Sequence, residues 1–392
     1  MGRGRQAAGG GGGAMSGTEA MRYALLGDTG LFVSRLSLGA LTFGAQEGDG
    51  LYQMIGNLDQ PAVNRMVAHA IDKGVNLIDT ANVYADGRSE AAIGQALRDL
   101  GIRRSDMIIA TKFFSRTGAG PNDIGGSRAH IMASVEASLK RLGTDHIDLY
   151  QMHGQDPITP EEETLRALDD LVARGMVRYV GCSNWQAWKL MKALAVSDRR
   201  GLTRFQSLQA YYSIAGRDLE REIAPLIQDQ KIGLMVWGAL AWGLLSGKYR
   251  RDGGDSGGGG GEGRRAQLDY PPVDRERAWA CIDEMRAIGD AHGVSVARVA
   301  IAWLLSKPYV STIVVGAKSL EQLDDNLAAM ALELDADELA RLDAVSALPP
   351  EYPGWAVDLM NKTRLPQPGQ GPGGLGDRLR QSAADNGGSA PC

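Results

Sequence analysis

Short apolar runs alternate with longer amphipathic segments along most of the chain. In the amphipathic segments apolar residues recur every three or four positions, which predicts helices that bury one face, and the shorter runs predict strands. The segment 161–173 shows the helical spacing well, and Thr159-Pro160-Glu161 is expected to cap it and to place acidic residues in its first turn. Its expected apolar face consists of Leu165, Leu168, Leu171 and Val172.

Strands and helices are expected to alternate from residue 36 onward. The expected strands lie near 36–40, 75–79, 107–111, 147–151, 177–182, 205–209, 232–237 and 311–315. The expected helices lie near 61–73, 88–99, 127–142, 161–173, 186–195, 218–229 and 275–291. Before them a hairpin is expected at about 22–26 and 31–34, because Gly27-Asp28-Thr29-Gly30 is rich in residues that tolerate turns.

This alternation predicts the fold class. Short apolar strands between amphipathic helices indicate a parallel sheet covered by helices. Eight repeats over roughly 300 residues fit an α/β fold of the (β/α)8 TIM barrel type, with its active site at the carboxyl ends of the strands. An open doubly wound sheet is the alternative, but it would place a Gly-rich turn after its first strand, where this chain has ALTFGAQEG. The hairpin is expected to close the bottom of the barrel.

Low-complexity segments set the expected domain boundaries. Residues 1–20 are rich in Gly and Ala and are expected to be disordered, as is the tail 364–392. The barrel domain is expected to span 21–363, with a Gly-rich insertion at 250–265. Letter matches to a dinucleotide-binding fingerprint occur in the first segment and in the insertion, but neither lies in a strand–turn–helix context, so both are rejected.

Charge and composition narrow the classes of function. The formal net charge of -5 gives no general attraction to nucleic acid or to anionic membranes. The longest apolar stretches are interrupted by Gly and are too short to span a bilayer. Three cysteines in a long chain do not form a disulfide framework, and no signal-peptide pattern opens the chain. We therefore expect a cytoplasmic protein without nucleic-acid or membrane partners. Metal-binding motifs such as HExxH and CxxC do not occur, so no metal is expected.

Four polar residues at the ends of three successive strands carry the candidate chemistry. Asp79 ends one expected strand and Tyr84 follows it, while Lys112 and His153 follow the next two strands. Each residue alone has an ordinary interpretation, as a loop cap, a strand-end polar residue or a surface aromatic. All four at one end of a barrel would instead lie together, and we interpret them as a catalytic set.

Such a set is suited to proton transfer. A lysine cation beside a tyrosine favours the phenolate and lowers the phenol pKa, and an aspartate can hold that lysine charged and in place. A histidine nearby can orient a carbonyl oxygen. Together these groups would give a proton to an oxygen that gains negative charge, as happens when a hydride reaches a carbonyl carbon.

The chain resembles the aldo-keto reductase superfamily over about residues 22–345, including the branch that contains the β subunits of voltage-gated potassium channels. The motifs that carry the resemblance occur in order as LIDTANVYADGRSE, ATK, IDLYQMH, VRYVGCSNW, MVWGALAWGLLSGKY and VVGAKSLEQLDDN. The resemblance implies a barrel that binds NADP(H) without a Rossmann fold and reduces an aldehyde or ketone to an alcohol. It implies that Tyr84 is the proton donor, that Lys112 and Asp79 tune it, and that His153 orients the carbonyl. A small-molecule carbonyl substrate is expected, and a homo-oligomer is allowed.

By position, the resemblance also implies a set of cofactor contacts. The residues are Thr42, Ser183, Asn184, Gln209, Trp237, Gly238, Ala239, Leu240, Lys248, Arg265, Gly316, Lys318, Gln322, Asp325 and Asn326. The hydroxyl and amide groups after the fifth and sixth strands would hold the nicotinamide carboxamide. Ser183 could at the same time cap the next helix. Trp237 could be a buried aromatic rather than the residue that stacks on nicotinamide. Lys318, before a helix expected to start at Ser319, would favour NADP(H) over NAD(H).

Three features bear on substrate and activity. Phe43, Phe114 and Trp185, together with Tyr212, are expected to line the substrate mouth and to favour apolar or aromatic carbonyls. Many relatives have Ser-Pro where this chain has Gly238-Ala239, so one side-chain phosphate contact is absent. The channel β subunits commonly carry Asn at the position of His153.

Two other functions are considered beside carbonyl reduction. One is a regulatory or redox-sensing subunit of the channel β type, which binds cofactor with little turnover; His153 favours turnover. The other is a metal-dependent barrel hydrolase, which the lack of metal motifs disfavours.

Overall fold

The computed structural model describes residues 21–249, 251 and 270–361. The two ends expected to be disordered, most of the Gly-rich insertion and Arg265 lie outside the described residues. Contacts divide the chain into compact units of residues Met1–Ala347 and Leu348–Cys392. The expected domain boundary at 363 stays a prediction.

Eight parallel strands form a closed barrel, which confirms the predicted (β/α)8 fold class. In chain order they are β3 (Leu36–Gly39), β4 (Leu77–Asp79), β5 (Ile108–Phe113), β6 (Ile147–Met152), β7 (Val177–Ser183), β8 (Ser207–Tyr211), β9 (Gly233–Trp237) and β10 (Val310–Val315). Each strand pairs with the next along the chain, and β10 closes the barrel by pairing with β3. The strands are short and nearly all buried, as expected where side chains fill the barrel interior and helices cover its outside.

The register brings particular strand ends together. Asp79 on β4 pairs with Gly39 on β3 and with Ala110 on β5. Lys112 on β5 lies opposite Gln151 on β6. Ser183 on β7 lies opposite Gln209 on β8 in the same way. Because all strands run parallel, these residues meet at the carboxyl end of the barrel.

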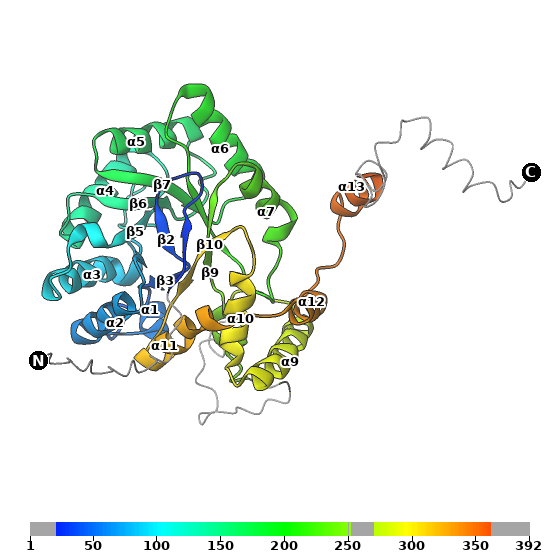
Figure 1. The fold of residues 1–392 in the computed structure, drawn as a ribbon. Coiled ribbons are helices and arrows are strands. Elements are labelled where there is room, and N and C mark those ends of the chain that lie inside the picture. The colour runs from blue at the N-terminus through cyan, green and yellow to red at the C-terminus, as the bar shows by residue number, and fades with distance from the viewer. Residues whose placement is uncertain (1–20, 250, 252–269, 362–392) are drawn as a thin grey trace, which may run out of the picture. The chain divides into compact units, whose positions relative to one another are not determined.

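In residues 21–347, helices alternate with the strands along the chain and lie around the outside of the barrel (Figure 1). They are α1 (Leu51–Ile55), α2 (Gln60–Asp72), α3 (Arg88–Asp99), α4 (Arg128–Leu142), α5 (Glu161–Ala173), α6 (Ala187–Arg200), α7 (Leu219–Asp229), α9 (Arg275–His292), α10 (Val296–Leu305), α11 (Leu320–Leu327) and α12 (Ala336–Val345). Short 3₁₀ segments are η1 (Tyr84–Gly87), η2 (Arg104–Asp106), η3 (Ala241–Ser246) and η4 (Ala328–Ala331). The second unit contains α13 (Gly354–Asn361).

The seven expected helices all form, and α11 begins after Ser319, which caps it by accepting a hydrogen bond from the Gln322 amide. Helix α10 was not expected. It is apolar nearly all round and buries most of its residues against both the barrel and neighbouring helices, so it lacks the one-sided spacing that reveals an amphipathic helix.

The expected cap of α5 is wrong in one respect. The first turn is acidic and the leucine face is buried, as predicted. The Thr159 hydroxyl, however, donates to the Asp156 carboxylate at 2.8 Å. The residue that caps α5 is Pro160, which makes no side-chain hydrogen bond to the helix. Asp156 therefore competes successfully for the threonine hydroxyl.

The N-terminal hairpin pairs β1 (Tyr23–Leu25) with β2 (Phe32–Ser34) in antiparallel fashion. Its turn lies against the amino ends of β8 and β9: a Cβ on Gly27 would come within 2.4 Å of the Gln206 carbonyl oxygen. Gly27 has a φ of +62°, so both the contact and the turn require glycine here. The hairpin thus closes the end of the barrel opposite the carboxyl ends of the strands.

No single helix in the part of the chain that the structure describes is long and apolar enough to cross a membrane. Helices α9 and α10 satisfy the length and composition together, but they are bent by 99° at the break between them.

Candidate active site

Lys112 is the buried centre of the candidate site. It is fully buried, and its ammonium group donates to Asp79 Oδ2 at 2.5 Å and to the Thr80 carbonyl at 2.8 Å. The third contact reaches the Tyr84 hydroxyl at 3.4 Å. Burial opposes the lysine charge, but the Asp79 carboxylate and Tyr84 outweigh it and raise the pKa of Lys112. Lys112 therefore remains a cation beneath Tyr84.

Tyr84 begins η1, directly after the β4 loop, and lines the cavity described below. We expected Lys112 to lower the phenol pKa. Lys112 does lower it, but burial has the larger effect, so the pKa of Tyr84 lies above the ordinary value. Tyr84 is consequently a protonated hydroxyl at neutral pH, held close to a cation that would stabilise its conjugate base.

His153 follows β6, and its ring meets the Tyr84 ring edge-on with centroids 5.8 Å apart. Burial, together with the nearby Lys112 cation, lowers the pKa of His153 to about 3. The imidazole is therefore neutral at physiological pH. A neutral imidazole has one N–H donor, which suits a carbonyl oxygen better than it suits an anion.

Asp79 is held from two sides. Lys112 binds one carboxylate oxygen, while the other accepts hydrogen bonds from the side-chain amides of Gln151 at 3.1 Å and Gln209 at 2.8 Å. The sequence analysis assigned Gln209 to the cofactor and did not single out Gln151. The structure places both amides against the Asp79 carboxylate.

A cavity of about 550 Å³ opens above these groups at the carboxyl end of the barrel. Most of the expected site residues line this cavity. They are Thr42, Asp79, Tyr84, His153, Ser183, Asn184, Gln209, Trp237, Gly238, Ala239, Leu240, Lys248, Gly316, Lys318, Gln322, Asp325 and Asn326. Two aromatic lining residues that the sequence analysis missed are Trp242 and Tyr270.

The indole of Trp237 lines this cavity, and a hydrogen bond holds it in place. Its N–H donates to the Asn184 side-chain oxygen at 3.0 Å. The Tyr270 ring lies nearly parallel to it, at 10° and with centroids 6.0 Å apart, and Trp242 meets Tyr270 edge-on. Trp242 has a φ of 55°, a left-handed conformation that is costly for a bulky residue and is typical of ligand-binding loops. Trp237, Trp242 and Tyr270 therefore give this part of the cavity an aromatic lining.

Ser183 has the buried hydroxyl that points most clearly to a ligand. Its Oγ has no hydrogen-bond partner within the described residues, although the side chain lines the cavity. The alternative role as a helix cap does not apply, because Gln186 precedes α6 and no side chain caps that helix. A buried hydroxyl without a partner is costly, so a polar group of a ligand would satisfy it.

The far end of the cavity lies at the start of α11. Lys318 donates its backbone N–H to Gln322 at 2.9 Å, and its ammonium group reaches the Met54 carbonyl at 3.2 Å. Asp325 also lines this end, but Arg298 and Ser295 both bind its carboxylate at 2.7 Å. Because Arg298 offsets the Asp325 charge, the helix N-terminus and Lys318 can attract an anion.

The aromatic residues expected at the substrate mouth do not line the cavity. Phe43 and Tyr212 are fully buried, and Trp185 is 4% exposed and packs edge-on against Phe205. The Phe114 ring is partly buried and lies beside Gly154. The aromatic side chains that line the cavity are instead those of Tyr84, Trp237, Trp242 and Tyr270.

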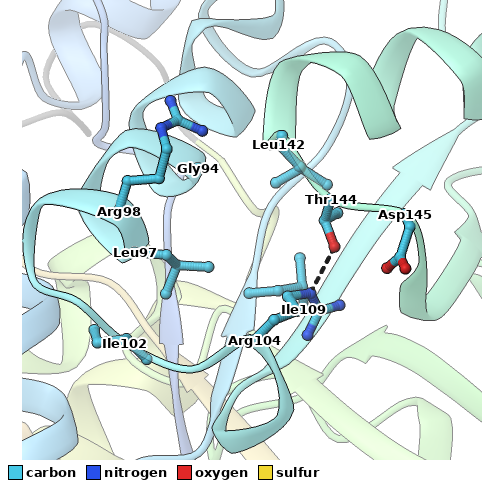
Figure 2. A pocket seen from close by; sticks show the side chains of 10 residues that line it. Gly94, Leu97, Arg98, Ile102, Arg104, Ile109, Leu142, Thr144 and Asp145 are labelled. Atoms are coloured by element: carbon cyan, nitrogen blue, oxygen red, sulfur yellow. Dashed lines mark hydrogen bonds between the residues drawn. The ribbon is translucent and has the colours of Figure 1, made fainter.

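A second cavity, of about 330 Å³, lies near the amino ends of β5 and β6 (Figure 2). Its apolar side chains come from α3, the loop after it and the end of α4. The polar groups around it have partners within the chain: Arg104 donates to the Thr144 hydroxyl at 2.9 Å and also pairs with Asp148, while Arg98 donates to Gln95. The site with chemical groups directed at a ligand is therefore the larger cavity. No cluster of three or more potential metal ligands occurs among the residues described.

Comparison with known proteins identifies the family of the chain. The aldo/keto reductase family model matches residues 35–347. A probable voltage-gated potassium channel subunit beta of Arabidopsis thaliana is 38% identical over 316 residues, which cover 79% of this chain and 91% of the relative. An uncharacterized oxidoreductase of Bacillus subtilis is 35% identical over 347 residues, covering 86% of this chain and 100% of the relative. Versiconal hemiacetal acetate reductase of Aspergillus parasiticus is 34% identical over 345 residues, covering 82% and 96%. The chain belongs to the aldo/keto reductase family.

Proposed function

We propose that this protein catalyses the NADPH-dependent reduction of an aldehyde or ketone to an alcohol, a reversible reaction with Tyr84 as proton donor. The observation that carries the proposal is the buried Lys112 cation, which binds Asp79 and lies under the Tyr84 hydroxyl at the base of the cavity. This is an arrangement for giving up a proton to an oxygen that gains negative charge.

The residues around the cavity fit a nicotinamide cofactor. The unsatisfied Ser183 hydroxyl and the amides of Asn184 and Gln209 are adjacent, and together they supply the donor and acceptor groups that a carboxamide needs. Trp237 offers a ring plane that its hydrogen bond to Asn184 fixes. Lys318 and the start of α11 would hold the 2′-phosphate. Lys248 and the backbone of 238–240 would lie along the pyrophosphate, and Arg265 remains a further candidate there.

The chain's own groups account for the other half of the reaction. When bound, NADPH supplies a hydride to the carbonyl carbon. The neutral His153 donates a hydrogen bond to the carbonyl oxygen and orients it toward Tyr84. Tyr84 transfers its proton to that oxygen, and the Lys112 cation stabilises the phenolate that remains until solvent reprotonates it. The aromatic walls provided by Tyr270 and Trp242 favour apolar or aromatic carbonyl compounds. We place the reaction in the cytoplasm, where buried thiols such as Cys182 and Cys281 stay reduced.

A fluorescence titration with NADPH, followed by an assay of NADPH oxidation, tests this proposal. The carbonyl panel includes 4-nitrobenzaldehyde and methylglyoxal, and the control is NADPH with protein and no carbonyl. We expect saturable binding and carbonyl-dependent oxidation. Absence of NADPH binding would refute the proposal.

A second function is supported by the similarity to potassium channel β subunits. In that case the chain would bind NADPH and act as a regulatory or redox-sensing subunit with little turnover. Tight NADPH binding without oxidation of any carbonyl in the panel would favour this second function over the first.

A further inference from the structure

Gln151 has an unusual position for a neutral polar side chain. It lies on β6, opposite Lys112 on β5, and is fully buried. It is not among the residues that line the cavity, so it is not placed to touch a ligand. Its amide nitrogen donates to Asp79 Oδ1 at 3.1 Å. A buried amide on a barrel strand is costly unless its hydrogen bonds are made, so its partners indicate its role.

The orientation of the two amides follows from the chemistry of Asp79. A carboxylate accepts hydrogen bonds and does not donate them, so both Gln151 and Gln209 must direct their nitrogen atoms at it. The Gln209 nitrogen is 2.8 Å from Asp79 Oδ1 and 3.5 Å from the Gln151 side-chain oxygen. Both N–H groups of Gln209 therefore point inward. What Gln209 presents to a ligand in the cavity is its oxygen, which is an acceptor.

We propose that Gln151 is a positioning residue that joins the catalytic ion pair to the cofactor pocket. Its N–H holds one oxygen of Asp79, so that the other stays directed at Lys112. Its oxygen holds the Gln209 nitrogen inward, so that Gln209 offers an acceptor to the amide N–H of the nicotinamide carboxamide. This inference rests on the proposed function, and it assigns Gln151 a role in both turnover and cofactor discrimination without contact to either reactant.

Gln151→Met tests the role, because methionine has a similar length and lacks the amide. We expect kcat to fall about tenfold, since Asp79 loses one of its three donors and Lys112 is held less firmly under Tyr84. The Kd for NADPH should stay within about twofold, because the residues that line the cavity are unchanged. Gln206→Met is the control: Gln206 precedes β8 and is partly buried, and its side-chain nitrogen donates to the Arg204 carbonyl at 3.4 Å rather than to Asp79.

A binding measurement tests the cofactor half independently of turnover. The probe is the NADP⁺ analogue whose carboxamide is replaced by a carboxylate. An acceptor oxygen on Gln209 repels that carboxylate, so the wild type should bind NADP⁺ at least tenfold more tightly than the analogue. In Gln151→Met the Gln209 nitrogen keeps Asp79 Oδ1 as an acceptor but loses the Gln151 oxygen. Its orientation is then less strictly fixed, so the ratio of the two Kd values should narrow by about threefold.

Gln151→Glu supplies a pH-dependent readout. A protonated glutamic acid can donate to Asp79 as the amide does, whereas an ionised one repels it. Relative to the wild type, kcat of this variant should rise as the pH falls. If Gln151 had a purely structural role, the ratio of the kcat of Gln151→Glu to the kcat of the wild type would not change with pH.

Several outcomes would overturn the inference. One is Gln151→Met with the kcat and the Kd ratio of the wild type. Another is a loss of kcat that Gln206→Met reproduces, or that is matched by a proportional loss of NADPH binding and of folded protein. If the wild type binds NADPH but oxidises it with none of the carbonyls in the panel, the proposed reductase function fails, and the Kd ratio alone then decides whether Gln151 positions Gln209.

Discussion

Two buried ion pairs lie on opposite faces of the same barrel wall. Lys112 on β5 faces inward and pairs with Asp79, and both side chains are almost fully buried. The preceding residue, Thr111, faces outward and donates to Glu90 of α3 at 2.5 Å. Glu90 is also fully buried and pairs with Arg141 of α4 at 2.6 Å. One strand thus contributes to a buried charge on either side.

The difference between the pairs is what their groups contact. Glu90 has a donor on each oxygen, and Arg141 donates also to Ser138 at 3.3 Å. The inner pair instead ends at the Tyr84 hydroxyl, 3.4 Å from Lys112, and this hydroxyl lines a cavity. Burial of charge is therefore a poor mark of an active site by itself. A buried charge coupled to a titratable group that faces a ligand cavity is a better one.

Removing the cation from each pair would separate structure from catalysis. Lys112→Met should destabilise the fold by about 3–5 kcal/mol, because Asp79 is left buried without its counter-charge, and should lower kcat about a thousandfold. Arg141→Met should also destabilise, by somewhat less, because the arginine side chain is 30% exposed. Its kcat should stay within about threefold of the wild type.

Urea unfolding and NADPH oxidation would measure these two effects on the same preparations. Equal losses of kcat in both variants would mean that the inner pair is structural in the same sense as the outer one. A Lys112→Met protein with near-normal turnover would remove the basis for the proposed mechanism.

The neutral state of His153 should make folding stability depend on pH. Its pKa is about 3 in the folded protein against an ordinary 6.5, so between these values the unfolded chain binds a proton that the folded chain does not. Stability is then present above about pH 6.5 and falls by about 1.4 kcal/mol per pH unit as the pH is lowered toward 3. Relative to His153→Asn, the wild type should lose at most about 2 kcal/mol between pH 7.5 and 5.

Denaturant unfolding of both proteins at several pH values would measure this dependence. Gln206→Met provides the control, since it retains His153 and changes no charged group, and it should show the pH dependence of the wild type. If His153→Asn has the same pH dependence as the wild type, the imidazole is not held neutral by its surroundings.

Replacing Lys318 should have the smallest effect of these changes, and on cofactor binding alone, because its side chain lies at the exposed rim of the cavity. Lys318→Met should weaken NADPH binding about tenfold and leave NADH binding within about twofold, since only NADPH carries the 2′-phosphate. Fluorescence titrations at low and moderate salt would measure both Kd values. Equal weakening for the two cofactors would refute the assigned role.

The barrel could be predicted from sequence, and so could the meeting of the four candidate catalytic residues at one end of it, because strand ends impose their own geometry. Once β4, β5 and β6 are parallel neighbours, Asp79, Lys112 and His153 must emerge at the same end. The period of the helices and the short apolar runs was sufficient for that inference. Helix α10 escaped because it is apolar nearly all round, and Thr159 was misjudged because Asp156, three residues earlier, offered a stronger acceptor.

The hydrogen bonds that individual buried side chains make could not be predicted in the same way. Gln151 and Gln209 meet Asp79 across 72 and 130 positions of sequence, and no local pattern records that both amides turn toward one carboxylate. Phe43 and Trp185 showed the opposite limitation: an aromatic residue near a strand end can face the core as readily as a cavity. The net pKa of Tyr84 likewise depended on how far burial offsets the neighbouring cation.

Tyr84→Phe tests the central claim most directly. This change removes the acidic proton and leaves the ring, so the cavity keeps its shape. With a carbonyl that the wild type reduces, we expect NADPH oxidation to fall about a thousandfold while the Kd for NADPH stays within about twofold. Near-normal oxidation by Tyr84→Phe would contradict the account, because the proton would then come from another group.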